Sequence, residues 1–390
     1  MNRCSILQCI FLVCTGVETF AGDSTFLTGM FVNHPSTSFR VVTNQSLKNA
    51  WAGDQLATGT TDGAGNFSAG FKLNTESQVL LFIGAAFYKL WLDPGASLNI
   101  TQKPTGISFA GSVARENKFM YAASLMQPFS VNHGFDQKFQ PEEVKTYFDS
   151  LETGRWKLYH QFFTNEKPSQ KFKDYCEGQI TGFTCFSLSQ YPMKFIYIDK
   201  SIGLKDVPGS YLEFWKKFRI QETDPGSDMY HNALRDYVAF LAMEQDKLRN
   251  ISAQQERPPQ QLQVNADLSR QENQMAIQLQ IMDSLLADNP ATLAVIKAVQ
   301  IDFMIKYFDF HNLTRTAIDK YANQFPGSEE ARLLTDKWQE KNKLTSSKPS
   351  FTLTNNEGRH VSLQDLNGSV VYIDFWGSWC KACLSQMPSS

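Results

Sequence analysis

Short runs of β-branched and aromatic residues, separated by turn sequences, make up residues 24–111. The turns contain Asn, Asp, Pro and Gly combinations such as Asp93-Pro94-Gly95, which interrupt regular structure. Between these turns the apolar residues show no long three- and four-residue spacing of the helical kind. The pattern predicts a small antiparallel β-sandwich. Its strands are expected to include residues 26–32, 39–42, 79–82 and 97–101.

From residue 112 to about 345 the apolar positions recur at three- and four-residue spacing, which indicates amphipathic helices. Pro141, followed by two glutamates, is a favourable helix start, because proline suits the first turn and acids suit the positive end of the helix dipole. Asn289-Pro290 is a break, and the polar stretch 254–263 predicts an exposed connection. Helices are expected at 113–125, 141–163, 211–218, 232–249, 272–287, 292–308 and 314–323.

The N-terminus carries the pattern of an export signal. A short positive start precedes the apolar run 5–17, and Ala21 provides a small residue for cleavage. Thirteen residues span only ~20 Å as a helix, short of a ~30 Å hydrocarbon core, so a stable membrane span is not expected. A lipoprotein signal is disfavoured because Val13, not a small residue, precedes Cys14. Residues 1–21 are therefore predicted to be a cleaved signal peptide, and the protein is expected in the periplasm or cell envelope.

Charge and composition narrow the function further. A formal net charge of −2 provides no basic footprint for nucleic acid. The six histidines are scattered without ligand spacing, so we expect no metal site and no cofactor. Three of the seven cysteines lie in the predicted signal peptide. The other four would meet an oxidising compartment, where cysteines are typically disulfides or redox catalysts.

The richest chemistry lies near the C-terminus. The apolar run 370–376 predicts a buried central strand, and it leads directly into Cys380-Lys381-Ala382-Cys383. A thiol at a helix N-terminus ionises readily, because unpaired N–H groups and the helix dipole favour an anion. Cys380 is therefore expected to attack a disulfide, and Cys383, one turn later, to resolve the mixed disulfide.

Three other interpretations of Cys380 and Cys383 fit the sequence less well. A zinc site needs two further ligands, and none follows in the sequence. A peroxiredoxin nucleophile would have proline and threonine upstream, which this segment lacks. A structural disulfide fits less well with a strand that feeds a Cys-x-x-Cys helix start.

Cys176 and Cys185 are equally consistent with two packed thiols or a loop disulfide. A disulfide would require a helix break at Gly178 or Gly182, because nine residues of helix rise about 13.5 Å.

Two segments around the motif resemble a known family. VVYIDFWGSWCKACLSQMP is similar to the active-site segment of the TlpA/ResA-like thiol–disulfide oxidoreductases of the thioredoxin superfamily, and KPSFTLTNNEGRHVSLQDLNG is similar to their leading hairpin. The resemblance implies that Trp379 shields the reactive sulfur. It also implies that Asp374 is a buried acid that exchanges protons with the resolving cysteine, Cys383. A carboxyl group buried among apolar neighbours has a raised pKa, which suits proton transfer near neutrality.

A weaker resemblance covers about ninety residues near the N-terminus. TGMF, DGAGNF, WLDPGASLNI and FAGSVARENKF are similar to a β-domain of unknown function. Bacteroidota envelope proteins place that domain ahead of a thioredoxin-like domain. The chain ends seven residues after Cys383, whereas a thioredoxin-like domain needs further strands and helices. We therefore expect a C-terminally truncated domain with little or no catalytic activity.

Together these patterns predict a multi-domain α+β protein. A signal peptide at 1–21 is followed by a β-sandwich at 24–111, a helical domain at 112–345 and the incomplete start of an α/β thioredoxin-like fold at 346–390. The expected activity is disulfide exchange with exported proteins, with electrons from an upstream donor. The motif does not fix the direction of the exchange. The alternative is an envelope binding protein whose first 345 residues hold a partner and whose redox domain is secondary.

Overall fold

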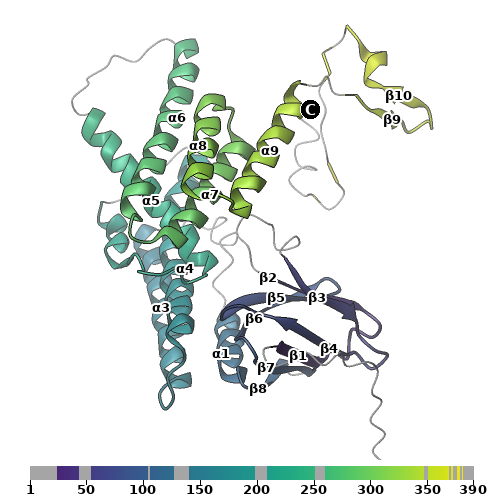
Figure 1. Ribbon diagram of the computed structural model, residues 1–390. Helices are drawn as coiled ribbons and strands as arrows, with labels where there is room; N and C mark the ends of the chain where they lie inside the picture. The colour runs from purple at the N-terminus through teal and green to yellow at the C-terminus, as the bar shows by residue number, and fades with distance from the viewer. Residues whose placement is uncertain are drawn as a thin grey trace, which may run out of the picture.

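The computed structural model describes residues 24–43, 54–103, 106–126, 140–197, 209–250, 260–346, 350–368, 370, 371, 376, 377 and 380. Strands occupy the N-terminal part and helices most of the remainder, so this is a multi-domain protein of mixed α and β structure (Figure 1).

Eight strands in the first part form two four-stranded sheets with the orders β4-β1-β7-β8 and β3-β2-β5-β6. Neighbouring strands are antiparallel except β1 and β7, which pair in parallel. This corrects the prediction of a wholly antiparallel arrangement, because the chain enters the second sheet and returns between these two strands. The strands are β1 (Ser24–Met30), β2 (Ser38–Thr43), β3 (Gln55–Thr60), β4 (Asn66–Lys72), β5 (Ser77–Ile83), β6 (Ala86–Leu92), β7 (Ser97–Lys103) and β8 (Gly106–Gly111).

One hydrophobic cluster takes side chains from both sheets. Leu27 and Ile100 of the first sheet are fully buried with Val41, Val79 and Leu81 of the second. Strand β5 has buried side chains on both faces, because Leu80 and Phe82 on its other face are also buried. The apolar alternation of these strands therefore stabilises the two sheets as one unit.

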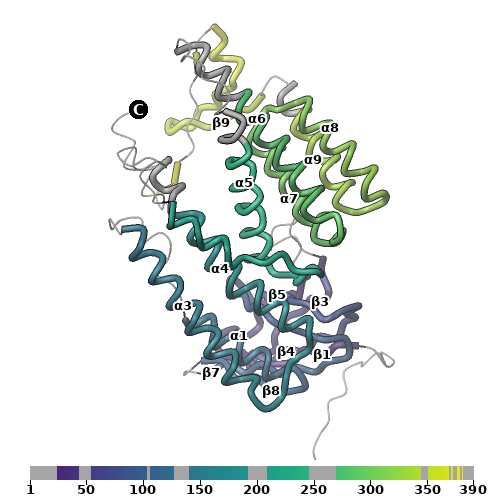
Figure 2. Tube along the Cα trace, turned by 90° about the vertical axis from the view of Figure 1, so that its left-hand side faces the viewer, coloured from purple at the N-terminus to yellow at the C-terminus, as the bar shows by residue number. Residues whose placement is uncertain are grey.

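The helices lie on one side of the sheets (Figure 1). Helix α1 contacts β6 and β8, α3 pairs with α4, and α4 pairs with α5. Helices α7, α8 and α9 contact one another and run side by side next to α6 (Figure 2). The helices are α1 (Ala114–Leu125), α3 (Pro141–Phe162), α4 (Gln170–Tyr197), α5 (Asp228–Asn250), α6 (Gln260–Leu285), α7 (Pro290–Tyr307), α8 (His311–Gln324), α9 (Glu329–Ser346) and the 3₁₀ helix η2 (Gly209–Lys217).

Two of the predicted signals for helix ends are confirmed. Pro141 is the first residue of α3, and Gln140 and Glu143 form a reciprocal capping box before it. Asn289 caps α7, where its side chain accepts a hydrogen bond from Thr292 N at 3.1 Å. The prediction of an exposed connection at 254–263 is wrong for residues 260–263, because they form the first turn of α6. Residues 254–259 lie outside the described residues.

Helix α4 was not predicted, and its two glycines do not break it. A Cβ added to Gly182 would lie 2.9 Å from Tyr230 N, and one added to Gly178 would lie 2.8 Å from the Ser227 Cβ. Both glycines therefore allow the N-terminal end of α5 to pack directly against α4. Close helix approach, rather than a helix break, explains these two positions.

An aromatic seam joins the second sheet to the helices. The Trp91 indole of β6 is 2% exposed, and its ring centroid lies 5.2 Å from that of Phe172 and 4.9 Å from that of Tyr175, both on α4. Phe119 of α1 and Phe163, just after α3, belong to the same buried cluster. We call this cluster the Trp91 seam.

The C-terminal part is a small hairpin that projects away from the sheets beyond α9 (Figure 1). Strands β9 (Thr352–Thr354) and β10 (His360–Ser362) pair antiparallel and are followed by the 3₁₀ turn η3 (Leu363–Leu366). The predicted buried strand at 370–376 is wrong at its start, because Val370 and Val371 are exposed and not in a strand. The described part of this segment contains no apolar layer that could cover them, since β9 is itself exposed. Residues 372–375 lie outside the described residues.

None of the helices in the described ranges has both the length and the apolar character that a bilayer crossing requires.

Candidate redox site

The hairpin ahead of the cysteine motif is shaped by one asparagine and one glycine. Asn355 Oδ1 accepts hydrogen bonds from Glu357 N at 3.0 Å and Arg359 N at 2.9 Å. Gly358 has φ of 79°, a left-handed conformation that suits glycine. These residues form the tight turn from which the β9–β10 register follows.

A capping box ends the hairpin. Asp365 Oδ2 accepts hydrogen bonds from Ser362 N and Ser362 Oγ, both at 2.8 Å. These bonds hold the pKa of Asp365 below its usual value, so its carboxylate stays charged at neutral pH. The local hydrogen bonds give this exposed segment a defined path toward the cysteine motif.

Cys380 is the one member of the predicted site that the structure describes. Its N–H donates to the Gly377 carbonyl oxygen at 2.9 Å, which marks a tight turn immediately before the motif. The side chain is half-buried, and its sulfur is disulfide-bonded. Cys176 and Cys185 are free thiols, so neither of them is its partner.

The other predicted site residues are not tested by the structure. Asp374, Trp379 and Cys383 lie outside the described residues. The described neighbour Trp376 is 57% exposed, so an indole already lies at the surface four residues before Cys380.

The two cysteines of α4 are packed thiols, which decides between the alternatives that the sequence left open. Both are buried, and both are free. Burial, reinforced by the negative charge of Glu116, raises the pKa of Cys176 well above its usual value. Burial also raises the pKa of Cys185 to about 12. Both sulfurs therefore remain protonated and poorly nucleophilic at physiological pH.

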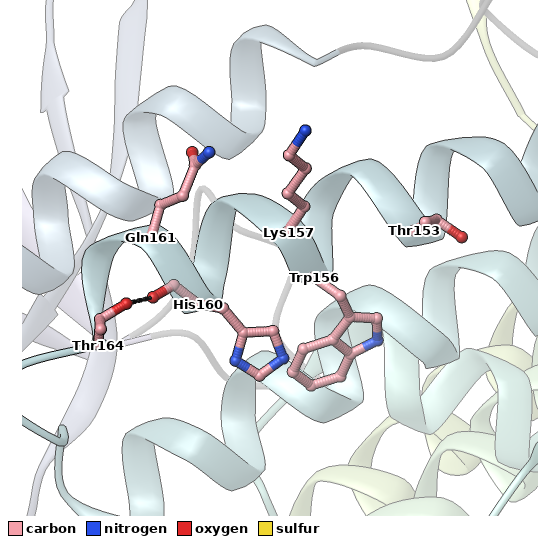
Figure 3. A pocket seen from close by; sticks show the side chains of 6 residues that line it. All are labelled: Thr153, Trp156, Lys157, His160, Gln161 and Thr164. Atoms are coloured by element: carbon pink, nitrogen blue, oxygen red, sulfur yellow. Dashed lines mark hydrogen bonds between the residues drawn. The ribbon is translucent and has the colours of Figure 1, made fainter.

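A surface hollow lies along α3. Figure 3 shows that Trp156 and His160 project to one side of the helix, with their rings stacked at a centroid distance of 6.1 Å. Thr164 Oγ1 donates a hydrogen bond to the His160 carbonyl oxygen. Five of its lining residues come from α3 and the sixth, Thr164, lies just after this helix, so the hollow is an open surface and not an enclosed site. The lining residues are Thr153, Trp156, Lys157, His160, Gln161 and Thr164.

Metal chemistry has no candidate within the described ranges, since no three His, Cys, Asp or Glu side chains there are grouped as metal ligands.

The C-terminal segment is similar to known redox proteins. Residues 345–390 match the AhpC/TSA family, so a thioredoxin-like family segment lies at this end of the chain. The match covers this segment alone, and the relatives similar to it are named thiol-disulfide oxidoreductases.

Several proteins similar to this segment are named thiol-disulfide oxidoreductase ResA. The protein from Bacillus thuringiensis (strain Al Hakam) is 43% identical over 49 residues, which cover 13% of this chain and 28% of the relative. The protein from Geobacillus thermodenitrificans (strain NG80-2) is 46% identical over 43 residues, covering 11% and 25%. The protein from Bacillus subtilis (strain 168) is 40% identical over 43 residues, covering 11% and 24%. This chain therefore spans about a quarter of the length of the curated relatives that it matches.

Proposed function

We propose that this protein is a thiol–disulfide oxidoreductase of the bacterial cell envelope that works through Cys380 and Cys383. The observation that carries the proposal is the disulfide-bonded Cys380 within a segment that is similar to ResA oxidoreductases. A cysteine that forms a disulfide while half-buried is accessible to exchange, unlike the fully buried thiols of α4.

The exchange transfers two electrons between sulfur atoms. The Cys380 thiolate attacks one sulfur of a substrate disulfide, which breaks the substrate S–S bond and releases the other sulfur as a thiolate. The Cys383 thiolate then attacks the Cys380 sulfur of the mixed disulfide. The products are a Cys380–Cys383 disulfide and a substrate dithiol, which takes up protons according to its pKa values. An upstream dithiol donor reduces the Cys380–Cys383 disulfide for the next turnover.

Two neighbouring residues are proposed to support these steps. Asp374 takes up and returns the proton of Cys383 during the second attack. Trp379 shields the Cys380 sulfur from water on one side. Both roles rest on the resemblance of this segment to the ResA-like oxidoreductases.

The remaining parts of the chain are proposed to place this chemistry in the envelope. Residues 1–21 act as a cleaved signal peptide, and the source is a member of the Bacteroidota. Residues 24–111 form a β-sandwich unit and residues 112–345 a helical unit, both ahead of the redox segment at 346–390. The shared core of the two sheets supports the first of these assignments. The partners are exported proteins with cysteine thiols or disulfides.

Trapping of mixed disulfides tests the function directly. In Cys383→Ser the second attack is lost, so mixed disulfides between Cys380 and envelope proteins should accumulate after acid quenching and alkylation. In Cys380→Ser the attacking sulfur is absent, and no adducts should form. Cys185→Ala is the matched control, because it removes a buried thiol of α4 and should leave trapping unchanged.

The reduction state provides the second readout. The wild-type protein should show a two-electron transition in a glutathione or dithiothreitol redox titration, with both cysteines of the motif protected from alkylation in the oxidised form. Adducts that persist in Cys380→Ser, or an oxidised form in which Cys383 remains alkylatable, would overturn the proposal.

A further inference from the structure

Asp93 occupies a rigid turn between β6 and β7. Thr25, which is fully buried, donates its Oγ1 hydrogen to the Asp93 carbonyl oxygen at 2.9 Å and accepts a hydrogen bond from Gly95 N at 3.2 Å. The Ala96 amide also donates to the Asp93 carbonyl oxygen, at 3.1 Å. These bonds fix the backbone of the turn, and the Asp93 side chain lies half-buried on it.

The carboxyl group of Asp93 is incompletely satisfied where it lies. Its Oδ1 is buried without a hydrogen-bond partner, and the side chain of Trp91 supplies a hydrogen bond to the group. An ionised carboxylate with a buried, unpaired oxygen is unfavourable, whereas the neutral acid is tolerated more easily.

Two further carboxylates, on different elements, act on Asp93 through their charge. Glu76, just before β5, accepts a hydrogen bond from Ser169 at the start of α4. Glu116 of α1 pairs with Arg115 at 3.3 Å, but its Oε2 is buried without a partner. Lys171 lies nearby and donates to Thr75, and Cys176 is a neutral thiol next to Glu116.

These surroundings set the protonation of Asp93. Burial first, and then the like charges of Glu76 and Glu116, raise the pKa of Asp93 to about 6. Because this value exceeds the ordinary 3.8, the folded protein binds the proton more tightly than the unfolded chain does. The stabilisation is complete below about pH 3.8 and is lost as the pH rises through about 6.

The Trp91 side chain, which hydrogen-bonds the Asp93 carboxyl group, also joins the second sheet to helix α4. The Trp91 indole packs against Phe172 and Tyr175 of α4 in the Trp91 seam. A negative charge on Asp93 therefore develops at the edge of the apolar contact between the second sheet and α4.

We propose that Asp93 is a protonation switch that loosens the contact between the second sheet and helix α4 when it ionises. In the protonated state the seam is closed, and the sheets and helices move as one body. In the ionised state the partnerless Oδ1 draws water to the turn, and this water weakens the packing of Trp91 on α4. The switch is independent of Cys380 and works within the described sheet and helix residues.

Hydrogen exchange of the first turns of α4 tests the proposal. After correction for intrinsic exchange rates, amides in residues 172–180 should exchange roughly tenfold faster at pH 7.5 than at pH 5, which corresponds to about one pKa unit of coupling. Asp93→Asn keeps the shape of the neutral acid but does not titrate, so this step should vanish and exchange should remain slow. Asp288→Asn, an exposed acid near the start of α7, is the matched control and should retain the step.

A second variant identifies the titrating group. Glu76→Gln removes one like charge from the surroundings of Asp93, so the midpoint of the exchange step should shift to lower pH. A merely structural change would alter the rates without moving the midpoint. An exchange step that persists in Asp93→Asn, or a midpoint that Glu76→Gln leaves unchanged, would overturn the proposal.

Discussion

At the scale of single residues, the side-chain amide of Asn117 makes the two backbone hydrogen bonds that a neighbouring strand would make to Trp91. Strand β6 is at the edge of its sheet, and the side chain of Asn117 on α1 satisfies the edge at Trp91. Asn117 Oδ1 accepts from Trp91 N at 3.0 Å, and Asn117 Nδ2 donates to Trp91 O at 2.8 Å. Asn117 is 1% exposed, so water cannot take over either bond. This amide fixes α1 against the sheet and closes one end of the Trp91 seam.

Replacing Asn117 by alanine should therefore be strongly destabilising. The Trp91 amide and carbonyl groups would remain buried without partners, which lowers the free energy of unfolding by about 1–3 kcal/mol. Urea unfolding, followed by circular dichroism, measures the difference. Asn99→Ala is the control, because the Asn99 side chain is exposed and its hydrogen bonds are to the Thr28 and Thr101 hydroxyl groups. Equal unfolding midpoints for the two variants would contradict the role of Asn117.

The residue scale also shows what the sequence could predict about the site. Cys380 was predicted from a local pattern, an apolar run leading into Cys-x-x-Cys. The structure shows its sulfur in a disulfide, and its redox role stays a prediction. Asp93 was predicted only as part of a turn. Its chemistry depends on Glu76 and Glu116, which are seventeen and twenty-three positions away in sequence and approach only in the folded protein.

At the scale of elements, the apolar pattern alone did not decide which elements were predicted. Strand β5 and helix α7 were predicted although side chains are buried on more than one face of each, whereas β4 and α9 were missed. Strand β4 alternates buried Phe67, Ala69 and Phe71 with exposed residues, a pattern that sequence could have revealed despite its small polar residues. Helix α9 likewise buries Ala331, Leu334 and Trp338 at helical spacing. Helix α4 has buried residues on several sides, so its pattern has no single apolar stripe. The parallel pairing of β1 and β7 could not be predicted, because alternation does not encode strand direction.

The glycines of α4 provide a prediction at this scale. Gly182→Ala should lower the free energy of unfolding by about 1–3 kcal/mol, because the added Cβ would meet the backbone of Met229 and Tyr230 and force α4 and α5 apart. Gly154→Ala is the matched substitution in α3. There the nearest atom is the flexible end of the Met126 side chain, so the gain in helix propensity, about 0.5–1 kcal/mol, should dominate. Chemical unfolding of both variants measures the contrast, and a stabilised Gly182→Ala would refute the close packing.

At the scale of the whole molecule, the sheets and helices are joined by contacts between residues far apart in sequence. The Trp91 seam joins β6 to α4, and an ion pair between Lys89 Nζ and Asp228 Oδ2 at 2.9 Å joins β6 to α5. Sequence patterns report periodicity within an element, and neither contact is visible in them. The succession of strands followed by helices could be predicted, but how they meet could not.

The Lys89–Asp228 pair makes the association of the parts sensitive to acid. Burial opposes ionisation of Asp228, but the charge of Lys89 and a hydrogen bond from Gln179 outweigh it and hold the pKa of Asp228 below its usual value. Because the folded pKa is lowered, the stabilisation is present above the unfolded pKa of about 3.9 and is lost as the pH falls through the folded value. This dependence is opposite in sign to that of Asp93.

Asp228→Asn should therefore reduce stability at neutral pH and not in acid. The pair is partly exposed, so solvent screening limits the expected loss to about 1 kcal/mol at pH 7. Once the pH has fallen below the lowered pKa of Asp228, both the carboxyl group and its replacement are neutral, and the two proteins should unfold at the same urea concentration. Lys89→Met should reproduce the loss at pH 7, and combining it with Asp228→Asn should add little, because each removes the same pair. A loss of equal size at pH 3 and pH 7 would show that the substitution acts through packing and not through charge.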